Sequence, residues 1–328
     1  MPRETRFAFV ANYFSNSISS YEVDPQTGRL TLRNTLPAGG VNSRVVVVEP
    51  SGRFAYVGNQ GSDNISVFAI DTSSGELSMV GQPVPTGHGP RFMLFGPTGN
   101  LLYVVNQDSN EISVFSINKS TGILTLVDNP AQSDDLPVAL ALYPSGQFAY
   151  VANANSSDIT VYRIDSAGRL GLTGAVPAPT NPVWLTIHPN GKFAYTANFG
   201  SNDISTFSVD ATDGSLRPQV GRTTTDAPTS INIDSHGRFA YVTNTRANTI
   251  SVFAIDADTG ALTPVSITQT GNNPVAFILD PSGRFAYAVN QGSDDVTQYS
   301  VDPATGLLTQ VGSSVDTGEG PVWLTLRK

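Results

Sequence analysis

A phrase of seven residues recurs along this chain, and it limits the possible folds more than any other feature. The phrase, Arg-Phe-Ala-Tyr-Val-x-Asn with small variations, ends each time at an asparagine, at intervals of 47, 47, 47, 45, 46 and 46 residues. These asparagines are Asn12, Asn59, Asn106, Asn153, Asn198, Asn244 and Asn290. A repeat of this period indicates similar structural units packed side by side.

Each repeat holds four short segments, here called a to d: an apolar run, Phe-Ala-Tyr-Val, Ile-Ser-Val-Phe-x-Ile-Asp and Leu-Thr-x-Val. All four are rich in Val, Ile, Phe, Tyr and Thr and are bounded by Gly, Pro, Asn or Asp, which is typical of β-strands. Four strands in each of seven repeats predict an all-β fold, a seven-bladed β-propeller of antiparallel strands. A β-solenoid fits this repeat less well, because its coils are usually shorter than 45–47 residues and contain fewer strands. No linker interrupts the repeats, so we expect one domain over residues 1–328.

The two ends of the chain carry parts of the same repeat. The chain begins in a b segment at Phe7 and ends in an a segment, from Val322 to Arg327. We therefore expect the N-terminal strands to pair with the C-terminal strand and close the ring, which removes exposed sheet edges.

Composition excludes several classes of function. The net charge of −9 and the pI near 4.7 argue against a nucleic-acid partner. No apolar run reaches the ~18 residues that a membrane-spanning helix needs. The lack of cysteine excludes disulfides, zinc–thiolate sites and iron–sulfur clusters. We expect a monomer with no cofactor or metal. No signal peptide is evident, which favours the cytoplasm, or the periplasm or cell surface if a leader has been removed.

The repeat also separates scaffold from chemistry. A residue found in every blade serves every blade, so the glycine of each Thr-Gly turn is expected to adopt a positive φ in the c–d hairpin. The aspartate before it is expected to close the turn. The amide of the recurring asparagine is expected to bond into the neighbouring b–c turn. A polar residue present in one or two blades is a better candidate for function.

Such residues gather on the face formed by the d–a and b–c loops, which vary between blades. At the position after the Gly-x-x-Pro turn, two successive blades carry Arg44 and Arg91, where the other blades have Val or Thr. The next position carries both tryptophans of the chain, Trp184 and Trp323, at the expected mouth of the central channel. His88, Glu111 and Arg246 are further singular residues of this face, whereas His188 and His236 fall in stereotyped a–b loops.

Two neighbouring arginines suit an anion such as a carboxylate or phosphate, because each guanidinium can donate two hydrogen bonds. An imidazole or carboxylate beside them, His88 or Glu111, is a candidate to activate water as a general base. Trp184, Trp323 and Arg246 are candidates for substrate binding. In the competing interpretation, both arginines pair with neighbouring acids and the tryptophans fill the channel.

The four phrases together resemble those of the lactonase family of seven-bladed propellers, which includes bacterial 6-phosphogluconolactonase and the fungal carboxymuconate-cyclising enzyme. The resemblance spans essentially the whole chain and implies a hydrolase of an anionic sugar lactone of the 6-phosphogluconolactone type. Tyr241-Val242-Thr243-Asn244 is also similar to the YVTN repeat of surface-layer propellers. The alternative function is therefore a non-catalytic binding or surface propeller, which the near-identical blades also favour.

Overall fold

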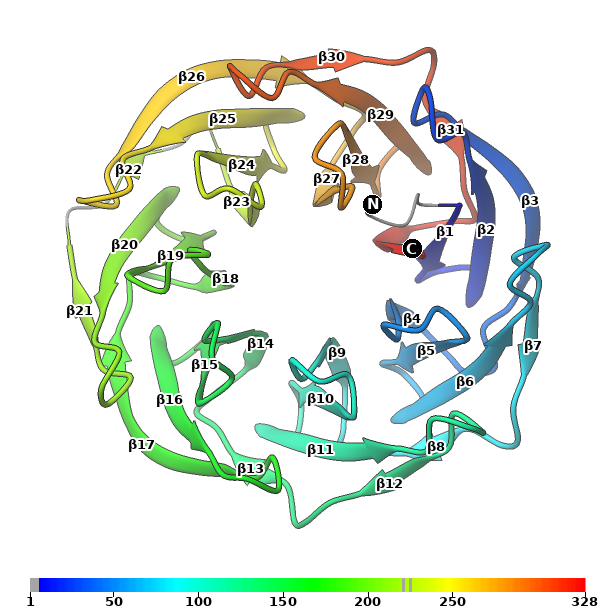
Figure 1. The fold of residues 1–328 in the computed structure, drawn as a ribbon, viewed down its shortest axis with the longest axis horizontal. Coiled ribbons are helices and arrows are strands. Elements are labelled where there is room, and N and C mark those ends of the chain that lie inside the picture. Colours follow the sequence, from blue (N-terminus) through cyan, green and yellow to red (C-terminus); the bar gives the residue numbers. More distant parts are fainter. Residues whose placement is uncertain (1–5, 220–221, 224–225, 328) are drawn as a thin grey trace.

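A computed structural model describes residues 6–219, 222–223 and 226–327. Within these ranges, every regular element is a β-strand, and the strands form seven antiparallel sheets arranged as blades around a central axis (Figure 1). This confirms the predicted seven-bladed β-propeller. The described residues contain no helix that could span a lipid bilayer.

The blades are numbered here along the chain, and each begins with its innermost strand. Blade 1 contains β32 (Pro321–Arg327), β1 (Phe7–Asn12), β2 (Ser17–Val23) and β3 (Leu30–Pro37). Blade 2 contains β4 (Ser43–Val48), β5 (Phe54–Asn59), β6 (Asn64–Ile70), β7 (Leu77–Met79) and β8 (Val84–Pro85). Blade 3 contains β9 (Pro90–Phe95), β10 (Leu101–Asn106), β11 (Glu111–Ile117), β12 (Leu124–Leu126) and β13 (Ala131–Gln132). Blade 4 contains β14 (Pro137–Leu142), β15 (Phe148–Asn153), β16 (Asp158–Ile164) and β17 (Leu170–Pro177).

The remaining blades follow the same order. Blade 5 contains β18 (Pro182–Ile187), β19 (Phe193–Asn198), β20 (Asp203–Val209), β21 (Leu216–Pro218) and β22 (Arg222–Thr223). Blade 6 contains β23 (Pro228–Ile233), β24 (Phe239–Asn244), β25 (Thr249–Ile255) and β26 (Leu262–Gln269). Blade 7 contains β27 (Pro274–Leu279), β28 (Phe285–Asn290), β29 (Asp295–Val301), β30 (Leu308–Gln310) and β31 (Val315–Asp316).

The outermost strand differs from the expected single segment. In four blades it is divided into two short pieces that both pair with the third strand. Gly81 and Gly312 lie at two of these breaks and have φ values of 67° and 68°, which ordinary extended strand does not allow. In blades 1, 4 and 6 the strand stays continuous and instead contains a β-bulge.

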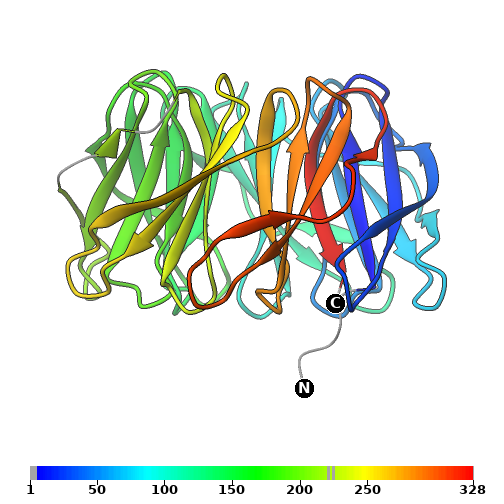
Figure 2. The ribbon, with the colours of Figure 1, turned by 90° about the horizontal axis from the view of Figure 1, so that it is seen from above.

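The ring closes as the sequence predicted. Strand β1 pairs with β32 from Phe7 opposite Arg327 to Asn12 opposite Pro321, so the two ends of the chain build one blade. Figure 1 shows the red C-terminal strand lying beside the blue β1. Seen from the side, β32 runs from one face of the ring to the other (Figure 2).

Recurring aromatic residues hold neighbouring blades together. The buried Tyr56 of blade 2 donates a hydrogen bond to the carbonyl of Gly122 in the c–d turn of blade 3, at 2.9 Å. Gly122 has a φ of 75°, and a Cβ there would lie 2.5 Å from Phe54. The turn therefore needs glycine for its φ and for the ring packed against it. Tyr103, Tyr195 and Tyr287 make the same bond to Gly168, Gly260 and Gly28.

The two faces of the ring are made from different loops. The a–b and c–d turns form one face, here called the turn face, and the d–a and b–c loops form the other, here called the mouth face.

In each c–d turn the Asp, or Asn118 in blade 3, accepts bonds from following backbone N–H groups, as Asp256 does from Asp258 and Thr259. Each recurring asparagine bonds through its amide to side chains of its own third strand, as Asn59 does to Asn64 and Ser66. The expected role of the turn aspartate is confirmed, whereas the asparagine bonds to its own third strand, at and beyond the end of the b–c turn, and not only to that turn.

Candidate functional site

A cavity of about 300 Å³ opens at the channel mouth, and one position of every blade lines it. That position is the second residue of each innermost strand: Arg44, Arg91, Val138, Val183, Thr229, Val275 and Val322. Phe92, Leu136, Ala154, Asn181, Trp184, Phe199 and Trp323 complete the lining. Arg44, Arg91, Trp184 and Trp323, which the sequence analysis placed at the channel mouth, thus line the same cavity.

A β-bulge at this position directs the side chains into the cavity. In blade 2, Ser43 pairs with Asn59 and Val45 with Gly58, so Arg44 has no partner in the ladder. Arg91 is skipped in the same way between Pro90 and Phe92. The other five innermost strands show the same irregularity. A bulge turns a side chain away from the ordinary alternation of a strand, and bulges are frequent beside active sites.

A hydrogen bond from the preceding blade fixes the start of each innermost strand. The backbone N–H of Gly89, two residues before Arg91, donates to Oδ1 of Asp63 in the b–c turn of blade 2, at 2.8 Å. The equivalent residues, Asn42, Leu136, Asn181, Ala227, Asn273 and Gly320, have side-chain acceptors in the same place. All seven residues have a positive φ. For Leu136 this conformation is costly, so the inter-blade bond holds a strained backbone at the cavity wall.

Arg44 and Arg91 lie partly buried in this wall without a neutralising partner. Neither guanidinium forms an ion pair with a carboxylate of the described residues. The Arg44 guanidinium lies 5.8 Å from the centre of the Tyr13 ring, and Arg91 Nη1 donates to Oε1 of Gln107 at 3.2 Å. Burial lowers the pKa of both side chains, and the charge of Arg44 helps to lower the pKa of Arg91 to about 9. The expectation that both arginines pair with acids is thus wrong.

Three aromatic rings from alternate blades form the floor of the cavity. Phe92 of blade 3, Trp184 of blade 5 and Trp323 of blade 1 meet with ring centres 5.5–5.6 Å apart. The two indoles are stacked, and Phe92 meets each of them edge to face, which are favourable aromatic geometries. The indole N–H of Trp184 donates to the carbonyl of Ile231 at 2.8 Å. Trp184 and Trp323 come from different blades, so they contact each other across the channel, one residue along the innermost strands from the bulge positions.

His88 and Glu111 do not line the cavity. His88 is 74% exposed, and its Nδ1 lies 2.8 Å from Oδ2 of Asp63. This hydrogen bond and the charge of Asp63 raise the pKa of the imidazole. Glu111 begins β11 and lies against Gly87, where a Cβ would be 2.1 Å from its Oε1. Both side chains belong to the rim of the mouth face, beside Asp108.

Arg246 is also outside the cavity, behind one of its walls. Its Nη1 lies 3.5 Å from Oδ1 of Asp226, and its guanidinium stacks on Phe199 at 5.1 Å from the ring centre. Phe199 lines the cavity. Arg246 is therefore an exposed, ion-paired cation that supports the wall from outside, unlike Arg44 and Arg91.

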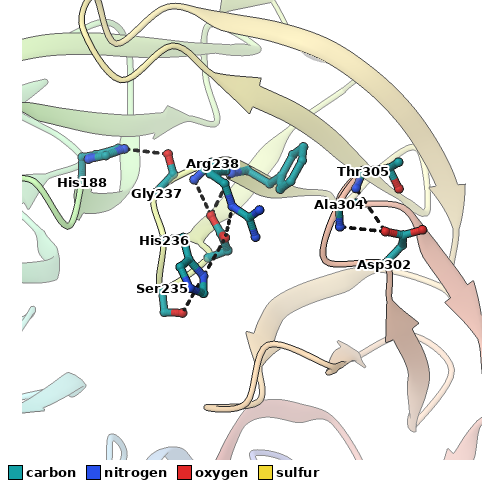
Figure 3. Close-up of polar contacts among 10 residues, drawn as sticks. His188, Ser235, His236, Gly237, Arg238, Asp302, Ala304 and Thr305 are labelled. Carbon is teal, nitrogen blue, oxygen red and sulfur yellow. Dashed lines mark hydrogen bonds and ion pairs between the residues drawn. The ribbon is translucent and has the colours of Figure 1, made fainter.

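The other two histidines lie in a–b turns, which belong to the turn face, and Figure 3 shows both side chains. His188 is buried, and its Nε2 donates to the carbonyl of Gly237 in the next blade at 2.8 Å. Its Nδ1 accepts a bond from the backbone N–H of Asn190 at 3.1 Å, so both ring nitrogens are used. His236 is exposed near Asp234.

In the described ranges, no group of three His, Asp or Glu side chains is placed to hold a metal ion.

The sequence profile of the family described as "Lactonase, 7-bladed beta-propeller" matches residues 2–89, 84–231 and 221–325. The chain belongs to this lactonase family. No curated protein sequence matches it.

Solved structures share the fold of this lactonase propeller at low sequence identity. A candidate 6-phosphogluconolactonase from Bacteroides uniformis superposes with a TM-score of 0.88 at 23% identity, covering 99% of this chain and 100% of the other. One from Bacteroides fragilis gives 0.86 at 21% identity, covering 98% of each chain. The periplasmic gluconolactonase of Pseudomonas aeruginosa gives 0.82 at 22% identity, covering 98% of this chain and 99% of the other.

Sequence reasoning missed a second ring of site residues in this lactonase propeller. The residue after each recurring asparagine belongs to the b–c loop and faces the mouth. It supplies Ala154 and Phe199 to the cavity lining, Tyr13 to Arg44 and Gln107 to Arg91. The available signal was that this position varies from blade to blade directly beside an asparagine that does not vary.

Proposed function

We propose that this lactonase propeller hydrolyses an anionic lactone in the cavity at the channel mouth. The observation that carries the proposal is the pair of partly buried arginines, Arg44 and Arg91, without a carboxylate partner among the described residues. Their mutual repulsion and lost hydration are relieved when an anion binds between them. Membership of the lactonase family supports the reaction class, and 6-phosphogluconolactone is the type substrate implied by the sequence resemblance.

The paired N–H groups of the arginines suit two roles in the reaction, which are binding the anionic group of the substrate and stabilising the oxyanion. A guanidinium presents paired N–H donors, so each can bind a carboxylate or phosphate through two hydrogen bonds. The same donors stabilise the oxyanion that forms when water attacks the lactone carbonyl. In the reaction, a bond forms between water oxygen and carbonyl carbon, and the bond from that carbon to the ring oxygen breaks. The ring oxygen takes up one of the two water protons to become a hydroxyl, and the carboxylic acid that forms releases the other proton to solvent.

His88 and Glu111 are the proposed activators of this water, and their position sets a condition. A general base must lie within hydrogen-bond reach of the proton that it removes. Both side chains belong to the rim of the mouth face, so the lactone carbonyl must lie at the rim on the Arg91 side. Replacement of each by an amide that cannot take up the proton, His88→Asn and Glu111→Gln, tests this role, and a loss of kcat with unchanged KM is expected for the true base.

The direct test is the release of acid from 6-phosphogluconolactone and simple aldonolactones, followed with a pH indicator. We expect turnover above the buffer rate, and a decrease of at least about tenfold in kcat/KM for Arg91→Gln. Arg33→Gln is the matched control, because Arg33 is exposed on the outermost strand and paired with Glu22. A folded protein that hydrolyses no lactone of the panel would remove the proposal.

One observation favours the alternative of a non-catalytic binding propeller. The described residues that line the cavity include no carboxylate and no imidazole. Under this alternative, the protein binds gluconate or another small anion in an Arg91-dependent manner but does not accelerate hydrolysis. Isothermal titration beside the hydrolysis assay separates the two functions.

A further inference from the structure

The cavity has an apolar part and a charged part. Together they indicate the kind of ring that the ligand carries as well as the sign of its charge. We infer that it takes a small carboxylate with a flat apolar ring, so that the preferred lactone carries an aryl carboxylate and few hydroxyl groups. This inference rests on the proposed function, because it concerns the substrate of the same site.

The apolar part consists of the aromatic floor and the wall above it. Phe92, Trp184 and Trp323 present ring surfaces to the cavity, and four of the seven bulge positions around the mouth are valines. Aromatic rings stack or meet edge to face with other flat rings, and such contacts add to the burial of apolar area. A sugar offers fewer apolar atoms and no π-face to this floor.

Apart from the arginines, the lining offers few groups that can bind a hydroxyl. The other polar groups of the described lining side chains are those of Thr229 and Asn181 and the indole N–H groups of Trp184 and Trp323, of which that of Trp184 donates to the carbonyl of Ile231. The Thr229 hydroxyl already contacts the hydroxyls of Thr243 and Thr245, at 2.9 and 2.7 Å. The Asn181 amide donates to the carbonyl of Ala154 at 3.3 Å. A polyhydroxylated ligand would therefore bury hydroxyls without partners, which is unfavourable.

The charged part selects one compact anion. Arg44 and Arg91 occupy neighbouring blades on one side of the mouth, and the other blades present uncharged side chains at the same position. A volume of about 300 Å³ is at the small end of ligand sites and suits one ring with a short substituent. A benzoate- or phenylacetate-sized anion places its carboxylate at the arginines and its ring on the floor.

The chain carries its own reporter for this test. Trp184 and Trp323 are its only tryptophans, and both line the cavity, so tryptophan emission monitors ligands directly. We would titrate the folded protein with phenylacetate, with gluconate and with neutral benzyl alcohol at constant pH and ionic strength, and repeat the series by isothermal titration. Gluconate has the same charge as phenylacetate, so a difference in affinity reports on the uncharged part of the ligand, which is a hydroxylated chain in one and an aromatic ring in the other.

We expect phenylacetate to bind at least about tenfold more tightly than gluconate, and benzyl alcohol to bind more weakly than phenylacetate by a similar factor. Phe92→Leu keeps an apolar side chain but removes a ring, and should reduce the preference for phenylacetate over cyclohexylacetate. If this variant does not fold, the wild-type series still decides. Equal or tighter binding of gluconate would overturn the inference, as would a failure of every carboxylate to bind.

A second arm separates this inference from the proposed function. Hydrolysis of phthalide-3-carboxylate would be compared with that of 6-phosphogluconolactone. Tight binding of phenylacetate without turnover of either lactone supports the inferred ligand and rejects the hydrolase. Faster turnover of 6-phosphogluconolactone supports the hydrolase and rejects the inferred ligand. Faster turnover of the phthalide supports both.

Discussion

Buried arginines have different surroundings on the two faces of the ring. On the turn face, Arg327 is buried but donates to the carbonyls of Gly52 and Thr72, at 2.7 and 3.3 Å. The turn aspartates there accept backbone N–H groups, and at Asp256 those bonds lower the pKa of the carboxyl group. On the mouth face, Arg44 and Arg91 are desolvated without a carboxylate partner in the described ranges. Arg327 on the turn face therefore helps to maintain the scaffold, whereas the charges of Arg44 and Arg91 at the mouth are available to a ligand.

The largest effect should come from breaking the scaffold shared by both faces. Deleting residues 320–328 removes β32, which carries the buried Val322 and Leu324 and closes the ring against β1. The lost burial costs several kcal/mol, comparable with the ~5–15 kcal/mol stability of a whole domain. We expect an insoluble chain or one whose Tm is more than about 10 °C lower.

A matched insertion controls for the change in chain length. Nine Gly and Ser residues between Gly81 and Gln82 extend an exposed connection of blade 2, and loop entropy rises only slowly with length. The insertion should lower the Tm far less than the deletion. A truncated protein that melts within about 2 °C of the intact chain would contradict the closure of the ring by β32.

The next effect concerns the two arginines at the mouth, which can be replaced by the residue that most other blades carry at the same position. Arg44→Val and Arg91→Val introduce the residue found at Val138, Val183, Val275 and Val322. Each variant should lose at least about tenfold in affinity for a carboxylate and gain roughly 1–4 °C in Tm, because a desolvated charge without a partner is removed. Arg33→Val should change neither quantity measurably. A decrease in the Tm of Arg91→Val would show that this arginine stabilises the scaffold.

The fold was largely predictable because the repeat transfers information from blade to blade. The role of the recurring asparagine or of the Thr-Gly turn, once interpreted in one repeat, applies to the others, and the end fragments at Phe7 and Val322 define the closure. The breaks of the outermost strand were not predictable, since Gly81 and Gly312 look like ordinary loop glycines until their φ values are known.

The site was predictable only where the repeat itself aims the side chain. Arg44, Arg91, Trp184 and Trp323 occupy strand positions whose direction is the same in every blade, so their convergence followed from the sequence. His88 lies on a loop, where the direction depends on the local backbone and on Asp63 of another blade. The closeness of His88 to Arg91 in the sequence was therefore not sufficient to predict whether the His88 side chain lines the cavity.

A smaller effect concerns the pH dependence of the mouth. A bound anion favours the charged form of Arg91, whose pKa in the free protein is lowered to about 9. Carboxylate affinity should therefore be constant from about pH 7 to 8 and fall as the pH rises through about 9, approaching tenfold per pH unit. Titration at constant ionic strength measures this slope. The residual affinity of Arg91→Val should not show it, and a slope that persists in this variant would assign the titration to another group.

The smallest effect should come from the turn face. Asp256→Asn introduces the residue that blade 3 already has at Asn118, which accepts the same two backbone bonds at 3.0 and 3.2 Å. At pH 7 the Tm should change by less than about 2 °C, and Asp256→Ala should lower it more. The lowered pKa of Asp256 contributes stability above its unfolded pKa, and this is lost as the pH falls through the folded value. The Asn variant should therefore lose less Tm between pH 7 and pH 3 than the wild type.

The bulge at the start of each innermost strand has a consequence for how such a protein can change. The bulged residue has no partner in the β-ladder, so replacing it does not disturb the register of the sheet. The mouth therefore consists of seven positions that can be exchanged while the strand register stays fixed. New ligand preferences can arise by single substitutions there, without compensating changes elsewhere, and the same positions are the natural targets for grafting a binding site onto this ring.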